Sequence, residues 1–486
     1  MFAAPVDFIC TGHVTINILP DEVLLLVFRF DRAVDPDGLS FHYRLDIPSW
    51  WWHRLAHVCR RWRSVVFASP NFLELRLIYG PNTNMKLSGI WPPLPVIIKS
   101  MEFLPIPEDR YFDTAIVPHN RAYEIELFVT GPEWHQFASA MQEQFPALIH
   151  LRLYYLYIGA GLPNPVLPDR LLGESAPKLE SLELHYISFP ALPKLLLSAT
   201  HLVRLDLQYV PHYGYMSPES FATGLAVSAN LEFLRVEFEP ARSRPYRDSR
   251  PPPPPTRIVL PALTHFELKA VGEWLEDVLV RIDAPLLDSV YITFFRQILL
   301  DISPLSRFLR CTAMLEELNE AHVVIGNDSI QVESLQPIPE FDNRSGLRIA
   351  CEGMNDQTSS LVQVITSLFP SLYVVEDLYI YGSEKSLKGW RDDTENTQWV
   401  EILRPFTAVK NLSVCKEFAR RITPALQELE GERVTDLLPA LKNLWLDELE
   451  PTGRTQKAIK QFVAARRLLA RPVAVSYWDR GVRPYP

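Results

Sequence analysis

The chain has 486 residues, of which 47% are hydrophobic, and it carries 48 Lys plus Arg against 58 Asp plus Glu, a net charge of −10. This length allows about three ordinary domains or one long array, and the apolar fraction excludes a disordered chain. The negative charge argues against a protein that coats nucleic acid, because such binding needs clustered Lys and Arg.

The cysteines and the apolar segments indicate a reducing compartment. Five cysteines are scattered without a C-x-x-C pair, so neither a disulfide framework nor a thiolate zinc site is expected. No stretch approaches the roughly 18 to 20 apolar residues of a membrane helix, and the segment after Met1 lacks the basic residues of a secretion signal. We therefore expect a cytoplasmic or nuclear protein without a membrane partner, in which the N-x-S patterns at Asn327, Asn343 and Asn411 are chance occurrences.

The first predicted element is a helix that begins near Pro20. Proline suits a first helical turn, and the acidic Asp21 and Glu22 behind it suit a helix N-terminus. Apolar residues at positions 23, 24, 27 and 28 form one stripe that must be covered. A turn-rich insertion follows, over about residues 31 to 49.

A second helix is predicted from Trp52 to Val66, and Ser69-Pro70 ends it. One face of this helix is apolar and the other carries arginines. A strand is predicted next, over residues 72 to 77. These pieces are too short to bury a core alone, so an exposed apolar stripe here would be an interface.

Both helices together resemble the F-box. The family pattern L-P-x-E-[VIL]-L-x-x-[IV]-F, followed by x-V-C-[RK]-x-W-R-x-[LV], is met by LPDEVLLLVF and HVCRRWRSVVFASP, which lie within about 60 residues of this chain. The insertion between the two halves is longer than in compact F-boxes. The resemblance implies docking onto a Skp-type adaptor and, through it, onto a cullin ligase core.

The resemblance also implies adaptor-binding residues. Leu19 and Pro20 would enter an apolar groove of the adaptor, and Trp62 would brace the second helix, with Val58 and Cys59 in a small core. The residues that would line the remaining contact are Val23, Leu24, Val27 and Phe28. The alternative that we keep is an ordinary amphipathic hairpin that caps the rest of the chain.

From residue 148 the pattern L-x-x-L-x-L recurs, which is the strand signature of a leucine-rich repeat. Successive copies begin roughly 29 residues apart. They start at Leu148, Leu179, Leu202, Leu231, Leu263, Leu287, Leu315, Val375, Val409 and Leu441, and a weaker copy contains Leu347 and Ile349. Strand-like pieces at residues 95–98 and 122–127 are predicted to begin the array. A set of unrelated buried strands is the alternative.

Several copies follow a proline, which ends the preceding segment and favours an extended chain. Positions 1, 4 and 6 of each copy are predicted to face the core, and positions 3, 5 and 7 the opposite, concave face of the sheet. Because one copy cannot bury its own apolar face, stacking would supply the core. The expected fold is therefore α/β: a short helical F-box followed by a leucine-rich-repeat solenoid.

The whole chain is similar to fungal F-box proteins with divergent leucine-rich repeats. A closing helix around residues 462–467 and a strand around residues 472–475 also resemble that group. We predict an F-box domain over residues 14–80 and a repeat domain with a C-terminal cap over residues 81–486. The Arg- and Pro-rich segment 242–257 is predicted to be a loop that projects between repeats. It is most simply a solvated spacer, and the alternatives are a ligand for an SH3-like domain and a loop that attracts phosphate.

No catalytic motif is found among the nucleotide-binding, hydrolase and zinc-protease patterns. His53 and His57 lie four residues apart and could share a metal, but a third ligand is missing. The Arg60–Arg63 cluster could contact nucleic acid, although the F-box interpretation explains it as a solvated face. We expect no enzyme activity, no cofactor, no metal and no nucleic-acid partner.

Target-binding residues can be placed only by the geometry of the concave face. Tyr, Trp and Arg are the side chains most often found at binding hot spots. The candidates are Arg152, Tyr154, Glu183, His185, Arg204, Asp206, Arg235, Glu267, Tyr291, Tyr379, Tyr381 and Trp445.

These residues lead to one main hypothesis and two alternatives. The main hypothesis is a non-catalytic substrate receptor of a Skp/cullin/F-box ubiquitin ligase, which holds a target protein near a charged conjugating enzyme. The first alternative is a repeat scaffold without ligase coupling. The second is a small-molecule receptor in which Arg152, Arg204 and Arg235 hold an anionic ligand.

Overall fold

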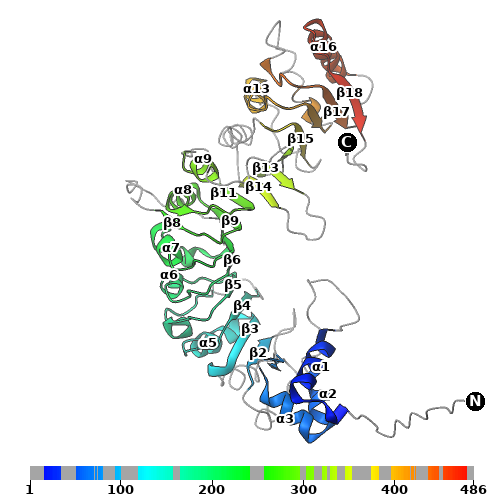
Figure 1. Cartoon of the computed structure of the whole chain (residues 1–486). Helices are drawn as coiled ribbons and strands as arrows, with labels where there is room; N and C mark the ends of the chain where they lie inside the picture. Colours follow the sequence, from blue (N-terminus) through cyan, green and yellow to red (C-terminus); the bar gives the residue numbers. More distant parts are fainter. Residues whose placement is uncertain are drawn as a thin grey trace, which may run out of the picture. The chain divides into compact units, whose positions relative to one another are not determined.

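The structure is a computed structural model, and its fold is α/β, with a large and mostly parallel sheet (Figure 1). The chain divides into two units, residues 1–127 and residues 128–486. The sequence led us to expect a division near residue 80, whereas this one falls inside strand β3 (Ala122–Val129). The described residues are 16–33, 51–70, 72–73, 75–79, 94–99, 119–156, 165–240, 257–295, 303–310, 320–325, 329–336, 345–352, 374–382, 396–415, 418–420, 422, 436–447 and 453–478.

The first unit contains a helical module and the beginning of a sheet. Its helices are η1 (Ile16–Ile18), α1 (Asp21–Ala33), α2 (Trp51–Val58), α3 (Arg60–Ala68) and η3 (His119–Arg121). Strand β1 (Leu77–Tyr79) pairs in parallel with β2 (Val96–Lys99), and β2 pairs in parallel with β3. The strand expected over residues 72–77 begins only at Leu77, because Phe72 and Leu73 lie in a turn.

The single helix predicted over residues 52–66 is wrong, because the structure has two helices that meet at Cys59. The backbone of Cys59 is extended, and its Sγ accepts a hydrogen bond from the backbone N–H of Trp62 at 3.4 Å. Cys59 therefore caps the N-terminus of α3 and ends the series of backbone hydrogen bonds in α2. The turn also leaves Val58 57% exposed, so its expected place in the core is wrong as well.

Aromatic contacts hold the three helices of the module together. The rings of Phe28 and Trp62 lie 4.7 Å apart, and Trp52 packs edge-on against Phe67. Trp52 is fully buried together with Leu24 of α1. Burying rings of this size is the main stabilising contribution in so small a module.

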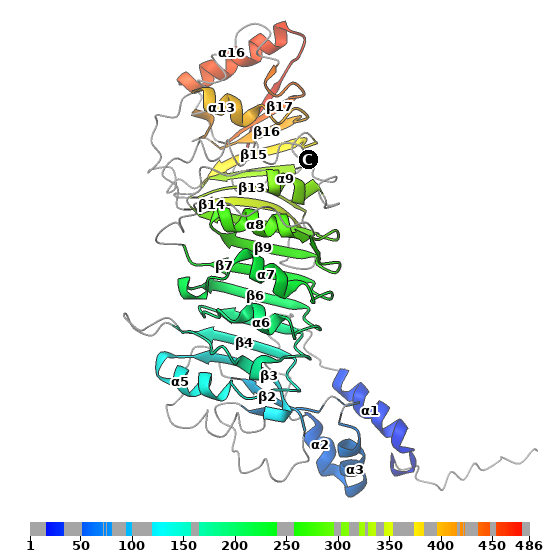
Figure 2. The same cartoon turned by 90° about the vertical axis from the view of Figure 1, so that its left-hand side faces the viewer.

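The second unit is one sheet with helices on its apolar face. Its helices are α5 (Gly131–Ala140), η4 (Leu171–Glu174), α6 (Leu192–Leu196), η5 (His212–Gly214), α7 (Pro218–Leu225), α8 (Gly272–Arg281), α9 (Ser303–Arg310), α13 (Asn396–Leu403) and α16 (Arg454–Leu468). Helices α6, α7 and α8 lie in front of the strands in Figure 2, each next to its neighbour. A strand followed by a helix is thus the repeating unit here.

The strands follow one another across the sheet with one exception, described below. They are β4 (His150–Tyr155), β5 (Ser181–His185), β6 (Arg204–Val210), β7 (Phe233–Phe238), β9 (His265–Ala270), β11 (Ser289–Phe295), β12 (Glu320–Ile325), β13 (Ser329–Gln336), β14 (Ser345–Glu352), β15 (Asp377–Gly382), β16 (Asn411–Val414), β17 (Asn443–Asp447) and β18 (Ala474–Trp478). Strands β8 (Ile258–Val259) and β10 (Ile282–Asp283) form a separate parallel pair.

The predicted core-facing positions of the L-x-x-L-x-L copies are confirmed for most of the copies. Positions 1, 4 and 6 are buried in β4 to β7, β9, β11 and β15 to β17, including the leucine or valine that precedes each strand. In β4 these residues are Leu148, Leu151 and Leu153. The polar residues between them alternate onto the other face, as the two-residue period of a strand requires.

The exception is the segment 320–352, where the predicted copy at Leu315 is wrong. Residue 315 lies outside the described residues, but Ala321 and Val323 of β12 pair with the core residues Leu378 and Ile380 of β15. The register is therefore three residues later than the pattern predicts. The polar Glu320, which the predicted copy would bury, pairs with Asp377.

The order of the strands also reverses in this segment. The sheet order is β11-β14-β13-β12-β15, and β13 runs antiparallel to both of its neighbours. Leu347 and Ile349 of β14 do face the core, opposite Val290 and Ile292 of β11. The antiparallel pairs β12–β13 and β13–β14 thus take the place of a parallel strand-helix-strand connection. Antiparallel neighbours can follow one another directly along the chain, which permits the reversed order.

A buried arginine fastens the C-terminal helix to the turn before β17. The side chain of Arg466 in α16 is fully buried. Its guanidinium donates hydrogen bonds to the carbonyl oxygens of Leu437 and Leu438, each at 3.2 Å, and to that of Leu441 at 3.3 Å. Because a guanidinium carries five N–H donors, it can satisfy several carbonyls of one turn at once.

We expect Arg466→Met to destabilise the second unit by about 2–4 kcal/mol, because the carbonyls would stay buried without donors. Urea unfolding followed by tryptophan fluorescence measures the loss. Lys457→Met is the matched control, since Lys457 is exposed on the same helix and should change stability little. Equal midpoints for both variants would contradict this role of Arg466.

Candidate functional site

The face of the sheet opposite the helices carries rows of polar and aromatic side chains. Parallel pairing from β4 to β11, which is in register except for one shift between β6 and β7 after Leu207, brings equivalent positions side by side. The row at position 5 consists of Arg152, Glu183, Asp206, Arg235, Glu267 and Tyr291. We call residues 3, 5 and 7 of the copies in β4 to β11 the ladder face. Most of the predicted target-binding residues lie on it.

The charged side chains that β4, β5 and β6 place on the ladder face neutralise one another. The Glu183 Oε1 atom lies 3.1 Å from Nε of Arg152 and 3.2 Å from Nε of Arg204. Arg204 also donates to Asp206 at 2.7 Å, and Gln208 donates to the second oxygen of Asp206. Because Glu183 and Asp206 are buried, their charges depend on these partners.

A second cluster surrounds Arg235. Its guanidinium forms an ion pair with Glu237 and lies 3.4 Å from Glu267. Burial raises the pKa of Glu237. Burial also acts on Glu267, but the neighbouring His265 imidazole, whose Nε2 lies 3.6 Å from Oε2 of Glu267, and the charge of Arg235 outweigh it and lower the pKa of that carboxyl. This second cluster therefore consists of partly buried groups whose charges compensate one another.

Stacked rings run beside these charges. Tyr154 stacks on Phe128 at 4.6 Å and contacts His185 at 4.5 Å between ring centroids. The Arg204 guanidinium lies 3.6 Å from the ring centroid of Phe233. Phe233 in turn stacks on His265, and His265 meets the ring of Tyr291 edge-on.

The C-terminal strands bring together the remaining candidates only in part. His322 of β12 stacks on Tyr379 at 4.7 Å and meets Tyr381 edge-on. Trp445 of β17 lies in the row of Tyr379, but Ser413 of β16 separates the two. A polar row runs beside them, in which the Asn443 amide donates to Asn411 and the Asn411 amide donates to the carboxylate of Asp377.

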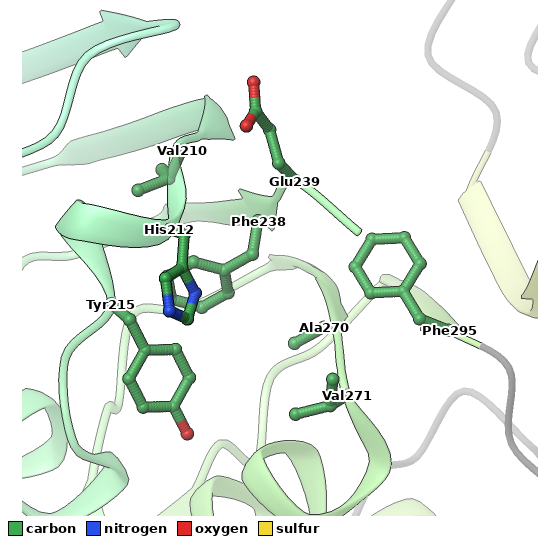
Figure 3. Close-up of a pocket in the computed structure, with 8 residues that line it drawn as sticks. All are labelled: Val210, His212, Tyr215, Phe238, Glu239, Ala270, Val271 and Phe295. Atoms are coloured by element: carbon green, nitrogen blue, oxygen red, sulfur yellow. The ribbon is translucent and has the colours of Figure 1, made fainter. Parts of the chain in front are cut away.

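An aromatic hollow of about 60 Å³ opens where β6, β7, β9 and β11 end (Figure 3). Phe238, Phe295, Ala270 and Val271 supply apolar walls, and the rings of His212 and Tyr215 stand on one side of it. The carboxylate of Glu239 points away from the rings in this view. Its lining suits an apolar side chain of a partner.

Sequence reasoning missed this hollow. Its walls are ordinary apolar residues that each end a different strand, so no local motif marks them. A usable signal was present in one short turn, which holds three aromatic side chains in the run Pro211-His212-Tyr213-Gly214-Tyr215. Tyr213 is 72% exposed there.

The predicted adaptor-binding residues do not all lie on one surface. Leu24 and Phe28 are buried inside the helical module, with exposed fractions of 0% and 1%, so they support the helix rather than line a contact. Trp62 braces α3 against Phe28. Leu19 is half-buried and Pro20 is exposed at the start of α1.

An exposed apolar stripe nevertheless covers α1. Val23 and Val27 are 38% and 42% exposed, and Leu26 and Phe30, which the sequence did not single out, are 59% and 71% exposed. At 100° per residue these four side chains share one side of the helix, beside the buried side of Leu24 and Phe28. We call them the α1 stripe.

An arginine fixes the turn in front of this helix. Arg61 of α3 donates to the carbonyl oxygen of Leu19 at 2.5 Å and to Oδ1 of Asp21 at 2.6 Å. The start of α1 is therefore held on α3, which orients the α1 stripe. This contact assigns a structural role to one member of the Arg60–Arg63 cluster.

The His, Cys, Asp and Glu side chains of the described residues form no candidate metal centre. No three His, Cys, Asp or Glu side chains gather there as metal ligands would. Cys59, Cys351 and Cys415 are free thiols, and burial raises the pKa of Cys351 to about 12. No helix of the described parts combines the length and the apolar character needed to cross a bilayer.

The anionic-ligand alternative meets an electrostatic obstacle. Arg152, Arg204 and Arg235, which it requires, each contact a carboxylate on the ladder face. An anion would have to compete with those carboxylates for the same N–H groups. Of the segment 242–257, predicted to be a loop, residues 242–256 lie outside the described residues, and Arg257 donates hydrogen bonds to the carbonyl oxygens of Leu279 and Val280.

Comparisons with known proteins do not identify a family. No model of a protein family matches the chain, and no curated protein matches it.

Acid is expected to destabilise the second unit through His185. Burial lowers the pKa of this imidazole. Below its ordinary pKa of about 6.5, the unfolded chain therefore binds a proton that the folded chain does not, and stability falls. Between about pH 7.5 and pH 5.5, we expect the urea midpoint of His185→Gln to fall less than that of the wild type.

His201→Gln serves as the matched control, because His201 is exposed on the same unit. Its pH dependence should follow that of the wild type. Identical pH dependence for the wild type and His185→Gln would show that His185 does not contribute.

Proposed function

We propose that this protein is the substrate receptor of a Skp/cullin/F-box ubiquitin ligase. Residues 14–80 would form the F-box and bind a Skp-type adaptor. The ladder face would bind a target protein, which the complex brings close to a charged conjugating enzyme. The protein itself would contribute proximity rather than chemistry. Such a ligase acts in the cytoplasm or the nucleus.

The observation that carries the adaptor-binding proposal is the α1 stripe. Four large apolar side chains lie exposed on a helix whose other side is already buried against α3. Leaving such a continuous patch in water is unfavourable, and patches of this kind mark interaction sites. The stripe begins just after the Leu19-Pro20 turn, which is the part of the F-box pattern that would enter the adaptor.

We also propose that the strand-helix units of residues 128–486 are divergent leucine-rich repeats. The support is that positions 1, 4 and 6 of nine copies are buried in equivalent places. Long parallel stacks of this kind present one extended face to a partner. The ladder face has the composition of a protein-binding surface, because arginine and aromatic side chains alternate with carboxylates.

Co-expression with a Skp-type adaptor, followed by a pull-down, tests the adaptor interface. We expect the wild type to co-purify at a ratio of about one to one. The double variant Val23→Glu, Val27→Glu should bind about a hundredfold more weakly, because two charges would be buried in an apolar contact. Neither side chain belongs to the core of the module, so the fold should persist.

A matched control is Ser64→Glu with Ala68→Glu, which places the same charges at the same spacing on the exposed side of α3. This variant should bind as the wild type does. If the folded wild type does not bind the adaptor, the chain is a scaffold without ligase coupling. If both double variants bind equally well, the α1 stripe is not the interface.

A further inference from the structure

A second groove lies at the C-terminal end of the sheet, remote in sequence from the F-box pattern. It has a volume of about 310 Å³ and runs between helix α16 and strands β17 and β18. Ile459 and Val463 line it from the helix, and Val475 and Tyr477 line it from β18. Figure 1 shows α16 and β18 next to each other.

The groove exists because the row of core side chains ends there. Val475 and Tyr477 lie in register with Leu444 and Leu446 of β17, which are buried. Tyr477, in contrast, is 55% exposed, since no further described strand follows β18 in the sheet. The outer backbone edge of β18 is likewise unpaired among the described strands. An edge of this kind can accept an additional strand.

The charge of the groove has one sign. Helix α16 has the sequence RTQKAIKQFVAARRL, with five Lys or Arg residues and no Asp or Glu. Two of them, Lys460 and Arg467, are exposed and line the groove, and its lining includes no carboxylate. This differs from the ladder face, where each arginine has an acidic neighbour, and from the chain as a whole, whose net charge is −10.

We propose that this groove binds an acidic, extended peptide segment of a partner protein. Apolar side chains of the peptide would fill the space between Ile459, Val463 and Tyr477, and its carboxylates would meet Lys460 and Arg467. Its backbone would pair with the open edge of β18. This site is separate from the adaptor and target surfaces, and it does not depend on the proposed ligase function.

The lining favours a peptide over a nucleic acid. Single-stranded nucleic acids need a row of aromatic side chains on which bases stack, together with a basic track. The groove offers a single ring, Tyr477, above aliphatic walls. The residues that follow Trp478 also fit poorly, because Arg480 and Arg483 outnumber Asp479 and repeat the charge of the groove.

Fluorescence anisotropy with the full-length chain tests the proposal. The probe is a fluorescein-labelled peptide in which Glu alternates with Val and Leu, and a second peptide replaces each Glu by Gln. We expect saturable binding of the acidic peptide and about tenfold weaker binding of the neutral one. Lys460→Glu and Arg467→Glu should each weaken acidic-peptide binding about tenfold.

Lys457→Glu is the matched control, because Lys457 is exposed on the same helix but does not line the groove. It should retain most of the affinity. An equal loss for Lys457→Glu and Lys460→Glu would mean general charge attraction and would overturn the proposal. Urea midpoints of all variants show whether each one is folded, and Tyr477→Ala gives a second, uncharged test of the same groove.

Two other outcomes would also overturn the proposal. In the first, a twelve-nucleotide single-stranded RNA binds more tightly than the acidic peptide and displaces it. In the second, the peptide binds only to a variant that ends at Trp478, which would mean that the chain's own last residues occupy the groove. Adaptor binding is measured independently of all these results, so failure of the ligase proposal would leave this one intact.

Discussion

The second unit depends on the lateral burial of apolar rows between parallel strands. A strand such as β5 places Leu182 and Leu184 on one face and cannot cover them by itself, although both are buried in the sheet. Pairing in register with β4 and β6 aligns these leucines with Leu151, Leu153, Leu205 and Leu207, and the helices cover the resulting layer. The same register aligns the polar residues of the other face. The ladder face is therefore a consequence of how the core is buried.

The apolar rows could be predicted from the sequence, because a period of two within a strand and a recurring leucine before it are local signals. The ion pairs could not be predicted in the same way. Glu183 meets Arg152 and Arg204 only because three strands share one register, and the sequence pattern does not fix which neighbour each side chain reaches. The sequence alone therefore allowed Arg152, Arg204 and Arg235 to be interpreted as cations that are free to bind an anion.

Other expectations failed for equally local reasons. The apolar positions 23, 24, 27 and 28 predicted for the first helix fall into two angular sectors, and periodicity alone could not decide that Leu24 and Phe28 face inward while Val23 and Val27 face outward. The break at Cys59 depends on the extended backbone of this residue and on one hydrogen bond to its sulfur. The reversed segment 320–352 alternates as any strand does, and alternation is the same in parallel and antiparallel pairs. The aromatic hollow combines the ends of several strands and leaves no contiguous signal.

The reversed segment affects the order in which the sheet can be completed during synthesis. Strand β11 pairs with β14 and not with the strand that follows it along the chain, so its outer edge has no native neighbour until Ser345–Glu352 has left the ribosome. In that interval the strands up to β11 form a block with an open edge, a state that favours wrong pairing and aggregation. Once β14 and β13 are in place, β12 presents the edge to which β15 adds in parallel. The two antiparallel pairs thus separate an early-forming N-terminal block of strands from a later C-terminal one.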